Sequence, residues 1–113
     1  MALVARGNNI TIAKGNQIKL CITPYISVPG YPYKLAEGEK VVFSVHQYKD
    51  YDPVIKAESD VQSEDGSVNF ILSSEDTNIP RGSYCWMASI ADSAGNIIDT
   101  FIGGVEYAAF YVK

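Results

Sequence analysis

Short apolar stretches in this chain are repeatedly closed by turn sequences. Three of these turns are Lys14-Gly15-Asn16, Asp65-Gly66 and Asp92-Ser93-Ala94-Gly95-Asn96. Between the turns, apolar and polar residues alternate with the period of two that is typical of half-buried β-strands. No long helical pattern interrupts this series. The sequence therefore predicts an all-β sandwich.

Eight strands are expected, and the apolar residues of each lie on one face, because successive side chains of a strand point to opposite faces of the sheet. The expected strands are 8–13, 17–23, 41–46, 54–61, 68–72, 83–91, 97–102 and 106–112. The expected core contains Leu20, Ile22, Phe43, Val45, Val68, Phe70, Trp86 and Phe110.

Two connections carry specific expectations about topology. The segment Pro24 to Lys40 is rich in proline, so we expect it to cross from one sheet to the other. Asp65-Gly66 predicts a hairpin between strands 54–61 and 68–72. The charges of strand 54–61 are typical of an edge strand that resists pairing with another chain.

Three shorter segments predict local structure. Ser73 to Asn78 has the capping residues and acids of a single helical turn. Gly103-Gly104 predicts a bend before the last strand. Gly82-Ser83-Tyr84 is similar to the tyrosine corner of sandwich folds, in which a tyrosine near the start of a strand hydrogen-bonds back to the preceding crossover.

Length and charge limit the class of protein. The 113 residues suit one domain, which we expect to span 1–113. The net charge of −4 and the scattered basic residues offer no surface for phosphates, so neither nucleic acid nor an anionic membrane is an expected partner. No apolar run reaches the roughly 20 residues of a membrane helix, and Arg6 interrupts the apolar start too early for a signal peptide. We expect a protein made and kept soluble in a cytoplasm.

The two cysteines are Cys21 and Cys85. The alternation of inward and outward side chains along a strand places both of them on the outward side. Sulfurs that face away from each other in different sheets cannot meet the Cα separation of about 4.4–6.8 Å that a disulfide needs. We therefore expect two outward-facing thiols and a reducing compartment of origin.

Residue groupings that carry out reactions are not visible in the sequence. His46 is the single histidine, so we expect no triad with a histidine base and no two-histidine metal site, and we expect its side chain to face solvent. Asp50, Asp52 and the acids from Asp60 to Asp65 offer oxygens, but their spacing matches no calcium-binding loop. The glycines form no phosphate-binding pattern. We expect no enzyme activity and no catalytic, cofactor-binding or metal-binding residue.

Tyrosines are the strongest candidates for contact with a partner, because eight are many for this length. Tyr31, Tyr33, Tyr48 and Tyr51 fall in or beside loops, where aromatic rings bind proteins or sugars. Loop tyrosines also simply cover the ends of a sandwich, and both interpretations stay open. We take Tyr31, Tyr33 and Tyr51 as the candidate partner-contact residues.

Strand and turn segments in a particular order run through most of the chain: Ile10 to Asn16, Ile18 to Leu20, Tyr33 to Val45, Asp65 to Val68, Ser73 to Thr77, Pro80 to Tyr84, and the turn at Gly95 with its closing strand. This series resembles the amino-terminal domain of phage baseplate upper proteins and related immunoglobulin-like domains coded by prophages of Gram-positive bacteria. The larger members of that family continue into a further region after this domain.

The resemblance implies an immunoglobulin-like antiparallel β-sandwich of seven to eight strands that serves as a non-enzymatic structural protein of a phage or prophage virion. Its partners would be other phage structural proteins of a tail or baseplate, or further copies of itself, and its place would be the virion. Exposed strand edges and the tyrosine-bearing loop from Pro24 to Lys40 are the expected contacts. A carbohydrate-binding or adhesive module at a bacterial cell surface is the alternative interpretation.

Overall fold

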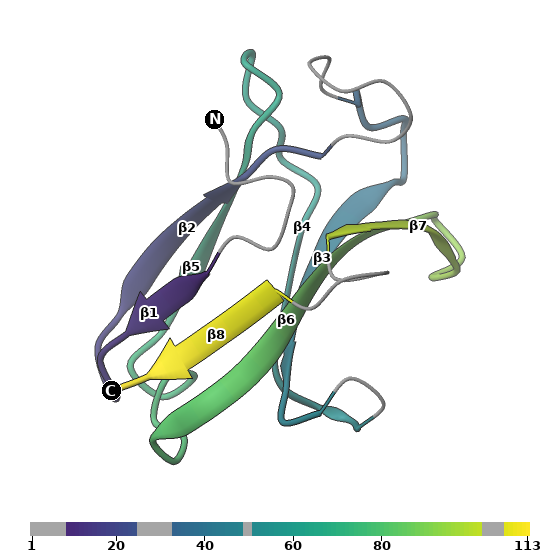
Figure 1. Cartoon of the computed structure of the whole chain (residues 1–113). Coiled ribbons are helices and arrows are strands. Elements are labelled where there is room, and N and C mark those ends of the chain that lie inside the picture. The colour runs from purple at the N-terminus through teal and green to yellow at the C-terminus, as the bar shows by residue number, and fades with distance from the viewer. Residues whose placement is uncertain (1–8, 25–32, 49–50, 103–107) are drawn as a thin grey trace.

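Two β-sheets face each other in the computed structural model, which describes residues 9–24, 33–48, 51–102 and 108–113 (Figure 1). These residues form eight strands and no helix, which confirms the all-β prediction. None of them forms a helix long and apolar enough to cross a membrane. The strands are β1 (Ile10–Ile12), β2 (Ile18–Ile22), β3 (Lys40–His46), β4 (Pro53–Ser59), β5 (Val68–Leu72), β6 (Gly82–Ala91), β7 (Ile97–Ile102) and β8 (Ala108–Val112).

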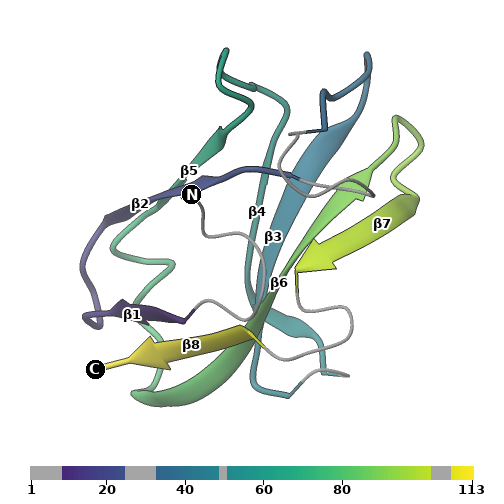
Figure 2. The ribbon, with the colours of Figure 1, turned by 45° about the horizontal axis from the view of Figure 1, so that its top comes forward.

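The larger sheet has the order β1-β8-β6-β3-β4, with β7 also paired to β6, and the smaller sheet consists of β2 and β5 (Figures 1 and 2). β8 pairs with residues 82–86 of β6 and β7 pairs with residues 88–91. Each of these pairings is antiparallel except that of β1 with β8, which is parallel. The expectation of a purely antiparallel sandwich is therefore wrong at β1. Alternation reveals which face of a strand is buried, but it carries no information on the direction of the neighbouring strand.

The core lies between the two sheets and is centred on Phe43. Its ring lies 5.5 Å from that of Trp86, 6.0 Å from that of Phe70 and 6.3 Å from that of Phe110, measured between centroids. The predicted core is confirmed, with Leu20 only partly buried and the other predicted residues buried. The period-two pattern therefore identified the inward faces of β2, β3, β5, β6 and β8.

The predicted hairpin at Asp65-Gly66 is wrong. β4 pairs with β3 in the larger sheet and β5 pairs with β2 in the smaller one, and an isolated bridge between Gln62 and Val68 is the antiparallel contact near the turn. The turn itself forms, since Gly66 has a φ of 91° and its N–H donates to the carbonyl of Ser63 at 2.9 Å. A turn signal fixes a local reversal of the chain but not the sheet that the next strand joins. The expected change of sheet between β2 and β3 is confirmed.

A hydrogen-bonded turn, rather than a helix, occupies residues 73–78. The Thr77 N–H donates to the Ser73 carbonyl at 3.1 Å, while the side chains of Ser73 and Asp76 bond each other's backbone N–H, as in a capping box. The buried Thr77 hydroxyl donates to the Asn16 carbonyl at 2.7 Å. This bond fastens the crossover to the turn between β1 and β2.

The tyrosine corner is present. The Tyr84 hydroxyl donates to the carbonyl of Pro80 at 2.5 Å, four residues upstream in the preceding crossover. Burial raises the pKa of this phenol above its ordinary value. Gly103-Gly104, where a bend was predicted, lies outside the described residues.

Candidate interaction site

Two exposed tyrosines pack against each other where the chain passes from β3 to β4. Tyr48 and Tyr51 are 60% and 59% exposed, and their ring centroids lie 5.0 Å apart in an edge-to-face arrangement. The Tyr51 N–H donates to the Tyr48 carbonyl at 3.0 Å. With the exposed residues Pro53 and Val54 that open β4, they form what we call the aromatic corner.

His46 holds the aromatic corner to the sheet. Its Nδ1 lies 2.7 Å from the carbonyl oxygen of Tyr51, and its Nε2 lies 2.8 Å from the hydroxyl of Ser44. The side chain is only 7% exposed, so the prediction of a solvent-facing histidine is wrong. The pairing of β3 with β4 shifts register between Val45 and His46, and the backbone of Tyr51 then lies against the imidazole. The alternation of side chains along β3 cannot predict that the backbone of Tyr51 buries the His46 side chain.

A groove of about 830 Å³ lies at the other end of β3 and β4, between residues 33–39 and residues 60–66. Gln62 joins the two walls. Its side-chain oxygen accepts from the Leu35 N–H at 2.9 Å, and its side-chain nitrogen donates to the carbonyls of Tyr33 and Gly66, each at 2.8 Å. The side-chain amide thus pairs with the backbone of residues 33–35 as a neighbouring strand would.

Tyr33 belongs to this groove and is tied to it. Its hydroxyl donates to Glu39 Oε1 at 2.7 Å, and the same oxygen accepts from the Ala36 N–H at 2.8 Å. The hydrogen bond to Glu39 raises the pKa of the Tyr33 phenol, with smaller contributions from burial and from the carboxylate charge. The seven-residue strand β3, roughly 20 Å long at about 3.3 Å per residue, separates Tyr33 from Tyr51. The structure therefore does not bring these two candidates together, and Tyr31 lies outside the described residues.

The groove is rich in carboxylates, with one lysine, Lys34, among its lining residues. Asp65 is engaged within its own turn, because its Oδ1 accepts from the Ser67 N–H at 3.0 Å and from the Ser67 hydroxyl at 2.6 Å. The bond from the Ser67 hydroxyl is the main reason that the pKa of Asp65 lies below its ordinary value. Within the described ranges, no three His, Cys, Asp or Glu side chains are grouped so that they could hold a metal ion. Asp50 is outside those ranges, and Asp52 is at the far end of β4.

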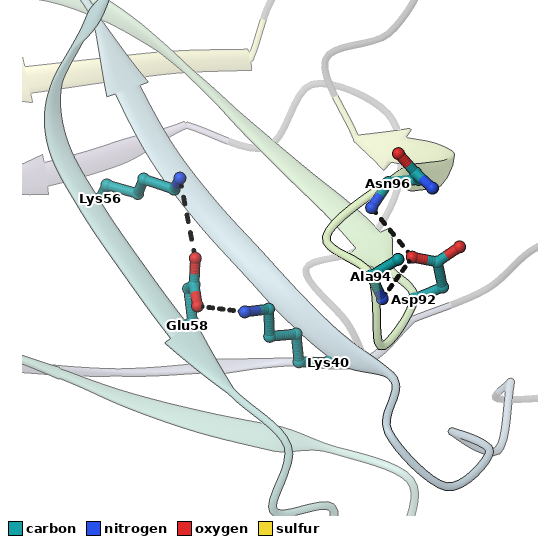
Figure 3. Close-up of polar contacts among 6 residues, drawn as sticks. All are labelled: Lys40, Lys56, Glu58, Asp92, Ala94 and Asn96. Atoms are coloured by element: carbon teal, nitrogen blue, oxygen red, sulfur yellow. Dashed lines mark hydrogen bonds and ion pairs between the residues drawn. The ribbon is translucent and has the colours of Figure 1, made fainter.

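Charges line the free edge of the larger sheet, where β4 lies, as predicted. Figure 3 shows Glu58 between two lysines, with Lys40 Nζ 2.6 Å from Oε1 and Lys56 Nζ 3.7 Å from Oε2. The hydrogen bond from Lys40 lowers the pKa of Glu58. The same figure shows Asp92 Oδ1 accepting from the N–H groups of Ala94 and Asn96, which closes the turn between β6 and β7.

The cysteines are thiols that differ in exposure. Cys21 is exposed on β2, as predicted. Cys85 is buried at 8% exposure, so a position on the outward side of its strand does not expose it to solvent. It lies on the central strand β6, opposite His46 of β3, and its sulfur approaches the His46 carbonyl at 3.6 Å. The expectation that the two cysteines form no disulfide is confirmed.

No protein-family model matches this chain, and no curated protein or solved structure does either. The site is therefore interpreted from its own geometry.

Sequence reasoning overlooked two groups of residues at these sites. Gln62 gave no signal, because one glutamine among acids and serines resembles any surface loop. Ser44 and His46 do carry a signal: residues two apart on a strand lie on the same face, so their side chains are neighbours.

Proposed function

We propose that this chain is a non-enzymatic immunoglobulin-like domain of a phage or prophage virion, which binds other tail or baseplate proteins through the aromatic corner. The source of the phage assignment is the resemblance of its ordered strand and turn segments to baseplate upper proteins. The observation that supports a binding role is the exposed, edge-to-face pair of Tyr48 and Tyr51.

Immunoglobulin-like topology is supported by the strand order. β8, β6 and β3 are neighbours in one sheet, and β2 and β5 pair in the other, as strands G, F, C and strands B, E do in immunoglobulin sandwiches. The hydrogen bond from Tyr84 to Pro80 corresponds to the tyrosine corner of that fold.

The aromatic corner suits a protein partner for two physical reasons. Tyrosine offers a large contact area at low conformational cost, and tyrosines are enriched among the residues that dominate binding energy. The tyrosine pair is held in place before a partner arrives, by the hydrogen bond between His46 and the Tyr51 carbonyl and by the backbone hydrogen bond between Tyr51 and Tyr48. This order reduces the conformational entropy that is lost on binding.

The test is capture of virion proteins by the purified chain from a lysate of bacteria in which the phage has been induced. We expect a tail or baseplate protein to be captured and capture to be lost when Tyr48 and Tyr51 are both changed to Ala. The matched control is Ile71→Ala, which removes an equally exposed apolar side chain from β5. Equal capture by all three proteins would contradict the proposal.

Carbohydrate binding at a cell surface is the second candidate, since exposed tyrosine rings also stack on sugars. It predicts binding to a polysaccharide array that is lost with the Tyr48 and Tyr51 changes, together with no capture of a virion protein. The same pair of variants therefore separates the two candidates.

A further inference from the structure

We propose that Ser44 is an activated nucleophile, a covalent modification site that accepts an acyl or phosphonyl group from an activated ester or fluoride. The inference is independent of the proposed function, because it concerns one reaction of a side chain rather than turnover. It rests on the hydrogen-bonded series from the Ser44 hydroxyl through His46 to the Tyr51 carbonyl.

The tautomer of His46 follows from its partners. A carbonyl oxygen only accepts hydrogen bonds, so the 2.7 Å contact with Tyr51 requires that Nδ1 carries a proton. In the neutral imidazole, Nε2 is then unprotonated and accepts from the Ser44 hydroxyl at 2.8 Å. This is the tautomer that a general base needs in order to remove the proton of a serine.

The third member of the series has the orienting role. An adjacent base activates a weak hydroxyl nucleophile, and that base is held in turn by a third group. Here the third group is the Tyr51 carbonyl, whose dipole favours the imidazolium that forms when His46 takes the proton. His46 is buried, so its ring is fixed in this orientation.

The surroundings of Ser44 suit the reaction of a small electrophile. The side chain is half-buried on β3, so it is open to small molecules. Lys56 of β4 is directly opposite it in the register of the two strands. Directly opposed residues have Cβ atoms about 4.5–5.5 Å apart, and the Lys56 ammonium is paired there with Glu58 Oε2 at 3.7 Å.

An alkyl fluorophosphonate reacts at the Ser44 hydroxyl with loss of fluoride. The Ser44 oxygen attacks phosphorus, the Oγ–P bond forms, and the P–F bond breaks to release fluoride. The hydroxyl proton passes to Nε2 of His46 and then to solvent. An activated aryl ester reacts likewise, with an Oγ–acyl bond formed and the aryl oxide released.

The experiment treats the folded chain with an alkyl fluorophosphonate and maps the adduct by peptide mass spectrometry over time. We expect Ser44 to be labelled. In His46→Gln the labelling rate should fall by about 100-fold or more, because a general base usually contributes at least that factor. Ser89→Ala is the matched control: Ser89 is a half-buried serine of β6 that bonds Thr100 rather than a histidine, and its loss should leave labelling of Ser44 unchanged.

Circular dichroism of each variant confirms that it is folded, and labelling of the unfolded wild-type chain gives the reactivity of unassisted serines. If Ser44 of the wild-type protein is labelled no faster in the folded state than in the unfolded state, the proposal is overturned without any variant. Equal labelling of Ser44 and Ser89 in the wild type would also overturn it, as would an unchanged rate in a folded His46→Gln protein.

Discussion

The side-chain amide of Gln62 pairs with the backbone of Leu35 across the groove, with 2.9 Å between its oxygen and the Leu35 nitrogen. The amide nitrogen makes two further bonds, to the carbonyls of Tyr33 and Gly66. One polar side chain thus fastens the connection into β3 to the crossover that leads from β4 to β5. It belongs to neither sheet, yet it fixes the relative position of two loops.

Changing Gln62 to Glu should destabilise this end of the sandwich. The carboxylate keeps an acceptor for the Leu35 N–H but loses both donors, and it places negative charge against two carbonyl oxygens. We expect a loss of about 1–3 kcal/mol in the free energy of unfolding, measured by urea denaturation, and faster hydrogen exchange in residues 33–39. Glu64→Gln, an exposed change in the same loop, is the control. A Gln62→Glu protein as stable as that control would show that the pairing does not operate in solution.

Removing the indole of Trp86 should be among the most costly changes in the chain. The side chain is fully buried and packs against Phe43 in the core. Trp86→Ala should lower the free energy of unfolding by about 3–5 kcal/mol. Val61→Ala, an exposed apolar truncation, should change it by less than about 0.5 kcal/mol. Similar denaturation midpoints for the two variants would place Trp86 outside the core.

The two thiols should react at very different rates. Cys21 is exposed and Cys85 is buried, so a colourimetric thiol reagent should modify one group per chain quickly and the second only on unfolding. Cys21→Ser should abolish the fast phase, and Cys85→Ala should leave it intact. Two fast groups in the native protein would contradict the burial of Cys85.

The Lys40–Glu58 pair should make stability depend on acid pH. The pKa of Glu58 is lower in the folded state than in the unfolded state. The contribution of Glu58 to the free energy of unfolding is therefore complete above its unfolded-state pKa, which is about 4.3 for a glutamate. This contribution is lost as the pH falls through the lower folded-state pKa. Wild-type protein should therefore exceed Glu58→Gln in stability near neutral pH, and the difference should vanish in strong acid. High salt should shrink it, because the pair is partly exposed. A difference that is constant with pH would show that the ion pair is not its cause. Glu75→Gln, on the crossover between β5 and β6, is the control.

Strand positions and inward faces were predictable because alternation of apolar residues is a local property of the chain. Phe43 and Trp86 could be assigned to the core from their own strands alone. Sheet membership was not predictable in the same way: Asp65-Gly66 specifies a turn, but whether β5 joins β4 or β2 depends on packing of the whole sandwich. The burial of His46 and Cys85 depends equally on what covers the outer face of the central strands.

Of the candidate partner-contact residues, Tyr51 is the one that the structure shows to be exposed, and no short sequence pattern predicts its contact with Tyr48. Tyr33 could not be recognised as part of a hydrogen-bonded groove wall, because its partner Glu39 is one of several nearby acids. The bond between Tyr84 and Pro80 was predictable because the tyrosine corner is a local motif with a fixed role.

Site-specific photo-crosslinking tests the proposed role of the aromatic corner most directly. A benzophenone amino acid is placed at Tyr48 in one protein and at Ile71, an exposed position on β5, in another, and each is irradiated in the lysate of an induced phage. We expect a covalent adduct with a tail or baseplate protein, or with a second copy of this chain in an assembled tail, at position 48 and not at position 71. An adduct formed equally at both positions, or no virion adduct at position 48, would contradict it.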